Sequence, residues 1–171
     1  MNVSDFYGYP KNIGEQNKMF IFEQEQIINQ PVSKIFSFFE KPENLSKLTP
    51  NWLRFNIKTK LPLGMKQGAE FEYTITIFGI SMKWKTLISK YSPPNFFIDE
   101  QVKGPYKRWV HTHSFKEING NVIIGDRVEY DLYGGFLKYI INIFVGLSVN
   151  KIFNYRKISI EKEFSDKNIT E

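Results

Sequence analysis

The sequence contains no cysteine. A nucleophilic thiol, a thiolate zinc site and a redox-active pair are therefore excluded, and disulfide bonds contribute nothing to stability. A chain of 171 residues can fold without them, because a domain of this size buries roughly 70% of the surface that its unfolded chain exposes. The length favours a single domain.

A strong charge of either sign is also lacking. The 23 Lys and Arg residues exceed the 18 Asp and Glu residues by five, and the two signs are interspersed. A nucleic-acid-binding domain more often has a basic stripe, so we expect no nucleic-acid partner. The hydrophobic fraction of 42% and the charged fraction of 24% argue against intrinsic disorder.

Long apolar runs are scarce. The longest, residues 139–149, is interrupted by Asn142 and is shorter than the ~20 residues that a membrane-spanning helix needs. The first residues, MNVSDFYGYPKN, have no basic segment followed by an apolar core, as a secretory signal would. We expect a cytoplasmic protein with no stable membrane insertion. Transient contact with a membrane is compatible with the sequence.

Aromatic residues, by contrast, are abundant: 16 Phe, 9 Tyr and 3 Trp. There is no internal repeat, low-complexity tract or dividing linker. We expect an N-terminal arm at 1–18, one domain at 19–165 and a C-terminal tail at 166–171.

The local patterns predict an α+β fold. A strand is expected at 19–29, short helices at 31–40 and 42–48, and a long helix at 136–164. Six further strands are expected at 52–59, 69–79, 81–91, 96–104, 108–118 and 121–132, the last two joined at Asn119-Gly120, which is typical of a tight hairpin. Strands segregated from helices indicate an antiparallel sheet, and burying its apolar face requires a strongly curved sheet around the long helix.

The long helix carries an apolar stripe that changes phase at Gly146. This predicts a break or kink near residues 146–148, between a short apolar helix and a long one. We expect residues 136–144 to be buried against the sheet. The alternative is a mobile lid that touches a membrane or a partner when ligand exchanges.

Strand alternation places unusual polar groups inside. Trp109, His111, His113 and Phe115 share the apolar face of their strand, so both histidines of the chain point into the concave side of the sheet. The same alternation turns Asp126 and Tyr130 inward on the next strand. On the preceding strand it turns Asp99 and Gln101 inward with Phe97, although the opposite face, with Phe96, Ile98 and Val102, is equally apolar. Buried polar groups need partners or cost about 1–3 kcal/mol each, which indicates either a cavity or a closed hydrogen-bond network.

Several segments resemble the START/pollen-allergen-like superfamily (SRPBCC), and most closely its bacterial ligand-binding and cyclase/dehydrase-like members. They are IINQPVSKIFSFFEKPENLSKLTPNWLRFNI, GISMKWKTLIS, PPNFFIDEQVKGPYKRWVHTHSF, GDRVEYDLYGG and IFNYRK, within residues 19–164. The resemblance implies the helix-grip fold: a seven-stranded curved antiparallel sheet wrapped around a long C-terminal helix, with two short helices after the first strand. It also implies a cavity between sheet and helix that binds lipids, polyketides or similar apolar molecules.

The inward polar groups allow three kinds of chemistry. His111, His113 and Asp126 could hold a metal ion, and His111 beside Asp99 or Asp126 could act as a general base. Both readings are weaker than a hydrogen-bonded network that orients a ligand, and Arg156 could add an ion pair to an inward carboxylate. We therefore expect no metal, no cofactor and no catalytic residue. The expected ligand-binding residues are Tyr73, Trp84, Asp99, Gln101, Trp109, His111, His113, Asp126, Tyr130 and Phe144.

The leading functional hypothesis is binding of a small hydrophobic molecule in the cavity between sheet and helix. The alternative is a cyclase or dehydratase that uses a pocket histidine as general acid or base. A third hypothesis is an interaction module whose groove accepts a partner helix or an acyl chain. The sequence leaves the oligomeric state open.

Overall fold

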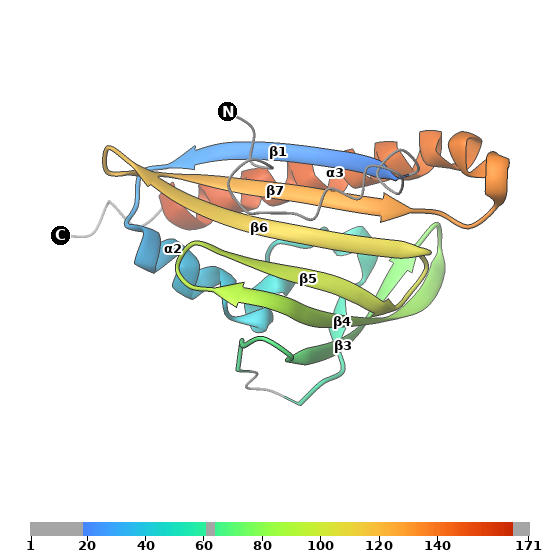
Figure 1. Ribbon diagram of the computed structural model, residues 1–171, viewed down its shortest axis with the longest axis horizontal. Helices are drawn as coiled ribbons and strands as arrows, with labels where there is room; N and C mark the ends of the chain where they lie inside the picture. The colour runs from blue at the N-terminus through green and yellow to red at the C-terminus, as the bar shows by residue number, and fades with distance from the viewer. Residues whose placement is uncertain (1–18, 61–63, 166–171) are drawn as a thin grey trace.

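The computed structural model describes residues 19–60 and 64–165. Seven strands form one antiparallel sheet in the order β1-β7-β6-β5-β4-β3-β2, and the long helix α3 lies across its concave side (Figure 1). The elements are β1 (Phe20–Ile28), α2 (Val32–Phe39), the 3-10 turns η2 (Pro42–Ser46) and η3 (Asn51–Leu53), β2 (Asn56–Ile57), β3 (Glu70–Ile77), β4 (Ile80–Ser92), β5 (Phe96–Lys103), β6 (Arg108–Ile118), β7 (Asn121–Asp131), η4 (Gly135–Leu137) and α3 (Lys138–Ser165). The predicted fold class is confirmed.

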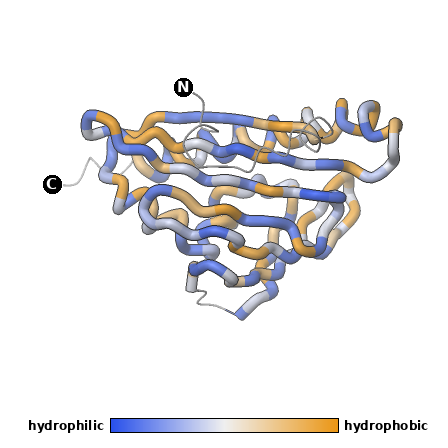
Figure 2. Tube along the Cα trace, viewed as in Figure 1, coloured by the Kyte–Doolittle hydropathy of each residue, from blue (hydrophilic) through white to orange (hydrophobic). Residues whose placement is uncertain are grey.

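The β6–β7 hairpin lies inside the sheet, between β1 and β5. Its two strands pair along their whole length, from Arg108 opposite Asp131 to Ile118 opposite Asn121. The connecting residues Asn119 and Gly120 both have positive φ, 51° and 77°, as the predicted tight turn requires. Hydrophobic and hydrophilic residues alternate along much of the sheet (Figure 2), which is the pattern of strands with one buried face.

The core has two parts, and both depend on α3. Near the end of α3, Ile160 and Phe164 pack with α2 and with the middle of the sheet. Further back along α3, Val149 and Phe153 pack against the last residues of β7. The C-terminal two thirds of α3 is therefore the helix that the sheet wraps around.

The expected strand at 52–59 is wrong in most of its length. Residues 51–53 form η3, and only Asn56–Ile57 pairs with β3. Pro50 precedes the first residue of η3, and Arg54 ends it in the left-handed region with φ 44°. The apolar alternation of this segment reflects its position under the cavity and not a strand.

The expected break near residues 146–148 is also wrong, because α3 is continuous from Lys138 to Ser165. The apolar stripe changes phase because the surroundings of the helix change. Before Gly146 most apolar side chains point away from the sheet: Ile140, Ile143 and Phe144 are 58%, 60% and 61% exposed. The expected burial of residues 136–144 against the sheet is therefore wrong.

The helical segment Gly135–Ser165 is long and apolar enough to cross a membrane, with a mean hydropathy of 1.4 in its most apolar part, of which only 17% is buried. The sequence analysis expected no apolar stretch long enough to span a membrane. By length and composition, this helix is long enough. Core helices of soluble proteins meet the same test. In this chain the second half of α3 packs on the sheet through Val149, Phe153 and Ile160.

Gly146 offers a direct test of the continuous helix. A Cβ atom added there would lie 3.7 Å from the Tyr130 hydroxyl, an ordinary van der Waals contact. We expect Gly146→Ala to raise the free energy of unfolding by about 0.5–1 kcal/mol, measured by urea denaturation. Gly120→Ala is the contrasting variant and should destabilise, because Gly120 has a φ of 77°. A loss of stability in Gly146→Ala would contradict the continuous helix.

Candidate ligand-binding site

A cavity of about 190 Å³ lies between the concave face of the sheet, α2, the 3-10 turns and α3. Most of its wall is apolar or aromatic. Polar residues line it from β4, β5, β6 and α3, and on the opposite side Lys41, Asn44 and Thr49 line it from the segment after α2. The side chains that line it from the sheet are Phe71, Tyr73, Ile75, Ile77, Trp84, Thr86, Ile88, Phe97, Asp99, Trp109, His111 and His113, and those from α3 are Val149, Ile152, Phe153 and Arg156.

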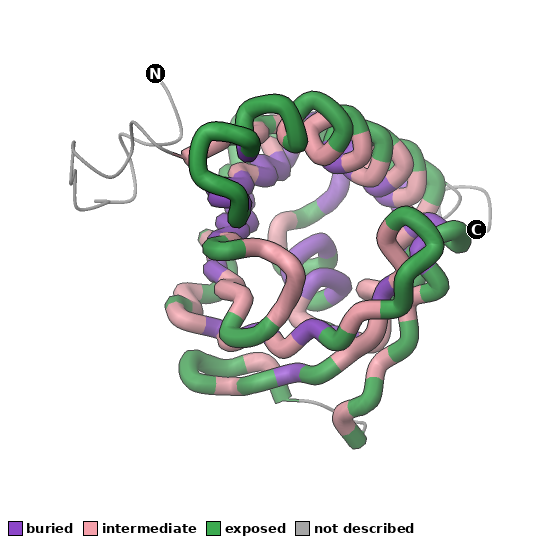
Figure 3. The backbone as a smooth tube through the Cα atoms, turned by 90° about the vertical axis from the view of Figure 1, so that its right-hand side faces the viewer, coloured by how far each residue is buried: buried purple, intermediate pink, exposed green. Residues whose placement is uncertain are grey.

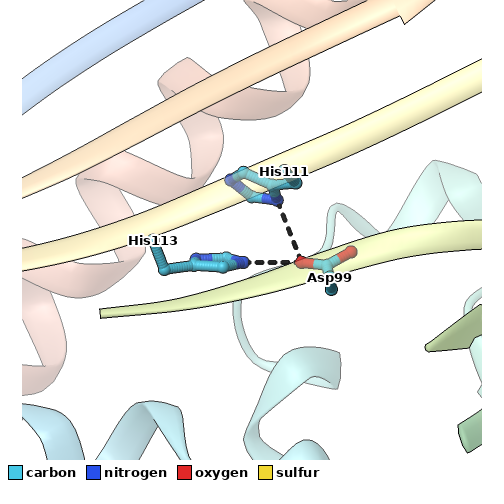
Figure 4. A group of neighbouring side chains, drawn as sticks. All are labelled: Asp99, His111 and His113. Carbon is cyan, nitrogen blue, oxygen red and sulfur yellow. Dashed lines mark hydrogen bonds and ion pairs between the residues drawn. The ribbon is translucent and has the colours of Figure 1, made fainter. Parts of the chain in front are cut away.

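The strand register assembles the polar part of this wall. Asp99 of β5 lies directly opposite His111 of β6, and His113 of β6 lies opposite Asp126 of β7. His113 Nε2 is 2.8 Å from Asp99 Oδ2, and His111 Nδ1 is 3.5 Å from the same oxygen (Figure 4). Thr86 of β4 donates a hydrogen bond to the other Asp99 oxygen at 3.3 Å. Three neighbouring strands thus supply one cluster.

Asp126 and Arg156 complete the cluster behind the histidines. His111 Nε2 lies 2.9 Å from Asp126 Oδ1. Arg156 Nη2 lies 3.0 Å from His113 Nδ1, and Arg156 Nε is 3.3 Å from Asp126 Oδ2. The second contact is an ion pair without the directionality of a hydrogen bond, since Nε has no hydrogen-bond partner. The cluster therefore ties α3 to the sheet through Arg156, the carboxylate contact that the sequence suggested.

The hydrogen-bond network assigns the histidine tautomers. A guanidinium only donates, so His113 Nδ1 accepts from Arg156 and His113 Nε2 donates to Asp99. The Asp126 carboxylate accepts, so His111 Nε2 carries a proton. Among the described residues, His111 Nδ1 has no hydrogen-bond partner and keeps its lone pair.

Burial and neighbouring charges fix the protonation states. Burial, followed by the adjacent His113, lowers the pKa of His111 to about 4, so this imidazole is neutral at pH 7. Burial raises the pKa of Asp126, but the Arg156 charge and the two histidines outweigh it and hold this pKa well below its usual range. Burial is likewise outweighed at Asp99, whose pKa is lowered by the hydrogen bond from His113 and by the charges nearby.

The aromatic wall contains a second unpaired polar atom. Trp84 is 5% exposed, and within the described part of the chain its indole Nε1 has no hydrogen-bond partner. The Trp84 ring stacks on Tyr73 at 5.8 Å and meets Trp109 edge to face at 5.4 Å. A buried N–H without an acceptor is uncommon in proteins, and this one belongs to a cavity-lining residue.

Six of the ten expected ligand-binding residues line the cavity: Tyr73, Trp84, Asp99, Trp109, His111 and His113. The other four do not. Gln101 holds the β5–β6 turn through hydrogen bonds to the backbone of Tyr106, and Asp126 lies behind the histidines. Tyr130 donates to Asn142 at 2.7 Å, and Phe144 is exposed on α3. Phe144 followed from the expected burial of its helix, and it fails with that expectation.

The sequence analysis missed the floor of the cavity. Leu45, Leu48 and Leu53 line it from the segment containing η2 and η3. Leu53 belongs to the expected strand at 52–59, and Leu45 and Leu48 belong to the expected short helix at 42–48. Neither expectation placed these side chains at a cavity, because the position of this segment depends on tertiary packing.

Asp99, His111 and His113 each offer one ligand atom, and these three atoms lie within 4.8 Å of one another. Two imidazoles and a carboxylate form a common donor set for transition metals. Asp99, and not the expected Asp126, completes this group. Arg156 already places a positive charge 3.0 Å from His113 Nδ1, which opposes a second cation. The residues therefore fit a metal ion poorly.

Comparisons with known proteins place the architecture. No family model matches the chain, and no curated protein sequence matches it. Solved structures do: major latex-like protein 151 from Panax ginseng has a TM-score of 0.64 at 14% identity, covering 85% of this chain and 97% of that one. A protein from Mycobacterium smegmatis has a TM-score of 0.63 at 13% identity, covering 86% and 92%. The chain has the helix-grip fold.

A third helix-grip neighbour is StfQ, a di-domain ARO/CYC from the steffimycin biosynthetic pathway. Its TM-score is 0.69 at 10% identity, and the match covers 92% of this chain and 55% of StfQ. These neighbours confirm the fold that the resemblance to the START/pollen-allergen-like superfamily implies. At 10–14% sequence identity, structural similarity shows that the fold is shared, and it does not identify a ligand.

His111 should make stability depend on pH. Its folded pKa of about 4 lies below the ordinary value of 6.5, so between these values the unfolded chain binds a proton that the folded chain does not. Stability is therefore lost as the pH falls through this window, by about 2–3 kcal/mol between pH 7.5 and 4.5. We expect His111→Gln to remove this part of the dependence in urea unfolding. Glu117→Gln, an exposed change on the same strand, should leave it intact, and parallel curves for wild type and His111→Gln would refute the assignment.

Arg156 should be the most sensitive charged residue of the helix. Arg156→Met leaves two carboxylates without their cation, and breaking a buried pair from one side costs about 3–5 kcal/mol. Lys151→Met, an exposed change on α3, should alter the unfolding free energy by no more than about 0.5 kcal/mol. Adding Asp126→Asn to Arg156→Met should recover part of the loss. Equal stabilities of Arg156→Met and Lys151→Met would contradict the role of the cluster.

Proposed function

We propose that the protein binds a small, uncharged and mainly apolar molecule in the cavity between sheet and α3. The observation that carries the proposal is an apolar aromatic wall that contains a buried indole N–H with no hydrogen-bond partner, Trp84 Nε1. The same wall contains His111 Nδ1, which offers a lone pair and has the Asp99 carboxylate 3.5 Å away. A ligand with one hydroxyl or a similar donor–acceptor group would satisfy these atoms, while its apolar body contacts the rings.

The cavity volume limits the size of the ligand. A volume of about 190 Å³ is somewhat larger than the ~150 Å³ engineered cavity that binds benzene. It is below the range of roughly 300–1,000 Å³ that is usual for drug-sized ligands. The cavity in this conformation fits a single-ring compound or a short acyl chain better than a sterol or a polycyclic polyketide.

The charges of the wall limit the ligand further. Asp99 and Asp126 are held ionised, His111 is neutral, and Arg156 is already engaged by His113 and Asp126. A carboxylate or phosphate placed at the polar cluster would lie beside the ionised Asp99, and Arg156 there is already engaged, so its desolvation would not be offset. The other cation of the lining, Lys41, is exposed and lies outside this cluster. The polar end of the ligand is therefore a neutral donor, which argues against a free fatty acid.

The cyclase or dehydratase alternative rests on the same histidine and has less support. A general base works best when its pKa lies near the operating pH. The pKa of His111, lowered to about 4, makes it a weak base at neutral pH. The atom that would remove a proton, His111 Nδ1, is suited to accepting a hydrogen bond.

A matched pair of probes tests this proposal. Phenol and benzoate have similar shapes, and only benzoate carries a negative charge at pH 7. We expect phenol to quench the fluorescence of Trp84 and Trp109, which line the cavity, in a saturable way, and benzoate to leave it unchanged. Isothermal titration calorimetry should give the same order.

Two variants make the test specific to the cavity. Trp84→Phe removes the indole donor and should weaken phenol binding about fivefold to tenfold, the effect of one hydrogen bond. Lys85→Ala, on the same strand and paired with Glu70 outside the cavity, should bind phenol like the wild type. Equal binding of benzoate and phenol, or no saturable binding of either probe, would overturn the proposal.

A further inference from the structure

The antiparallel register gathers three connections at one end of the molecule. Ile77 pairs with Ile80 at the β3–β4 turn, and Arg108 pairs with Asp131 where β6 begins and β7 ends. Figure 1 shows the start of α3 and the β3–β4 and β5–β6 turns at the same end of the sheet. Figure 3 views the molecule from this end, where much of the nearer part of α3 is exposed.

This end carries a concentration of exposed apolar side chains, which we call the apolar end surface. The β3–β4 turn contributes Phe78 at 69% exposure and Ile80 at 62%, and β5 contributes Val102 at 54%. The remaining members belong to the segment that enters α3 and to its first turns: Tyr133, Phe136, Leu137, Tyr139, Ile140, Ile141, Ile143, Phe144 and Leu147. Exposed apolar side chains gathered at one end of a protein in this number mark an interaction site.

The apolar side chains surround much of the helix and do not form a narrow stripe. At about 100° per residue, the exposed residues from Tyr139 to Leu147 span an arc of about 200°. The side with Lys138, Asn142 and Val145 faces the rest of the protein, and at the edge of the arc the Tyr139 ring also contacts Phe20 of β1. A partner helix would cover one narrow face, whereas an arc this wide fits a medium that surrounds the helix.

The charges of the same segments are almost all positive. Residues 77–83, 102–108 and 131–147 contain Lys83, Lys103, Lys107, Arg108 and Lys138, and their single acidic residue is Asp131. Asp131 is 6% exposed and is paired with Lys107 and Lys138. No acidic residue occurs from 132 to 160. The surface therefore complements a negatively charged partner.

We propose that the apolar end surface docks the protein on the interface of an anionic lipid bilayer. Apolar and aromatic side chains beside lysine and arginine are the features of interfacial anchoring, and each cation near such a surface adds about 1 kcal/mol of attraction. Association of two copies through this surface would bring like charges together. A membrane-spanning α3 would have to leave the sheet and take Arg156 from its carboxylate partner, so the attachment is peripheral.

Vesicle flotation with the full-length protein tests the proposal. We expect binding to vesicles of phosphatidylcholine with roughly 30% phosphatidylglycerol, much weaker binding to pure phosphatidylcholine, and a loss of binding as salt is raised from about 0.1 to 0.5 M. The double variant Ile140→Glu/Phe144→Glu should lower the partition coefficient about tenfold or more. Phe78→Glu, in a different segment of the surface, should also weaken binding.

The matched control is Ile158→Glu, because Ile158 is on the same helix and 65% exposed but lies far from the apolar end surface. It should bind vesicles like the wild type. All variants should keep the wild-type melting temperature and phenol binding, which separates this result from failure of the cavity proposal. No binding to anionic vesicles, equal loss in Ile158→Glu, no effect of Phe78→Glu, or a dimer in solution that Phe144→Glu dissociates would each overturn the proposal.

Discussion

The buried ion pair between Arg156 and Asp126, with the two histidines that it holds, connects the helix to the sheet. Removing these charges from water costs several kcal/mol per ion, and each must therefore keep its partner. Asp126 fixes His111, Arg156 fixes His113, and both imidazoles turn toward Asp99. The position of α3 over the sheet, the ionisation of the carboxylates and the free lone pair of His111 all follow from this arrangement.

The sequence was sufficient to predict the sheet and the inward histidines, because strand parity has a period of two and the apolar residues of β6 mark its buried face. It was not sufficient to predict which inward-facing side chains reach the cavity, because that depends on tertiary packing. Asp126 and Tyr130 have the predicted parity, but their polar atoms bond His111 and Asn142, and neither residue lines the cavity. The exposure of Phe144 was unpredictable for a related reason, since an apolar helix half has the same pattern whether a sheet or another medium covers it.

The abundance of aromatic residues has two explanations in this structure. Phe36, Phe115 and Phe164 pack as an ordinary core. Tyr73, Trp84 and Trp109 instead line the cavity. Rigid rings hold its walls apart, whereas flexible side chains would collapse into the space. Rings are therefore suited both to filling the core and to keeping the nearby volume of about 190 Å³ open.

The pairing of Asp99 with His111 and of His113 with Asp126 across neighbouring strands has a consequence for folding specificity. A slip of one residue between strands would turn every side chain to the wrong face, and the apolar pattern alone forbids it. A slip of two residues would restore the pattern of faces, and hydrophobicity would barely oppose it. In one direction, such a slip would place Asp99 opposite Trp109, or Asp126 opposite Phe115, and neither ring can pair with a buried carboxylate. The charged cluster thus opposes a two-residue slip in that direction, which the apolar pattern alone would permit.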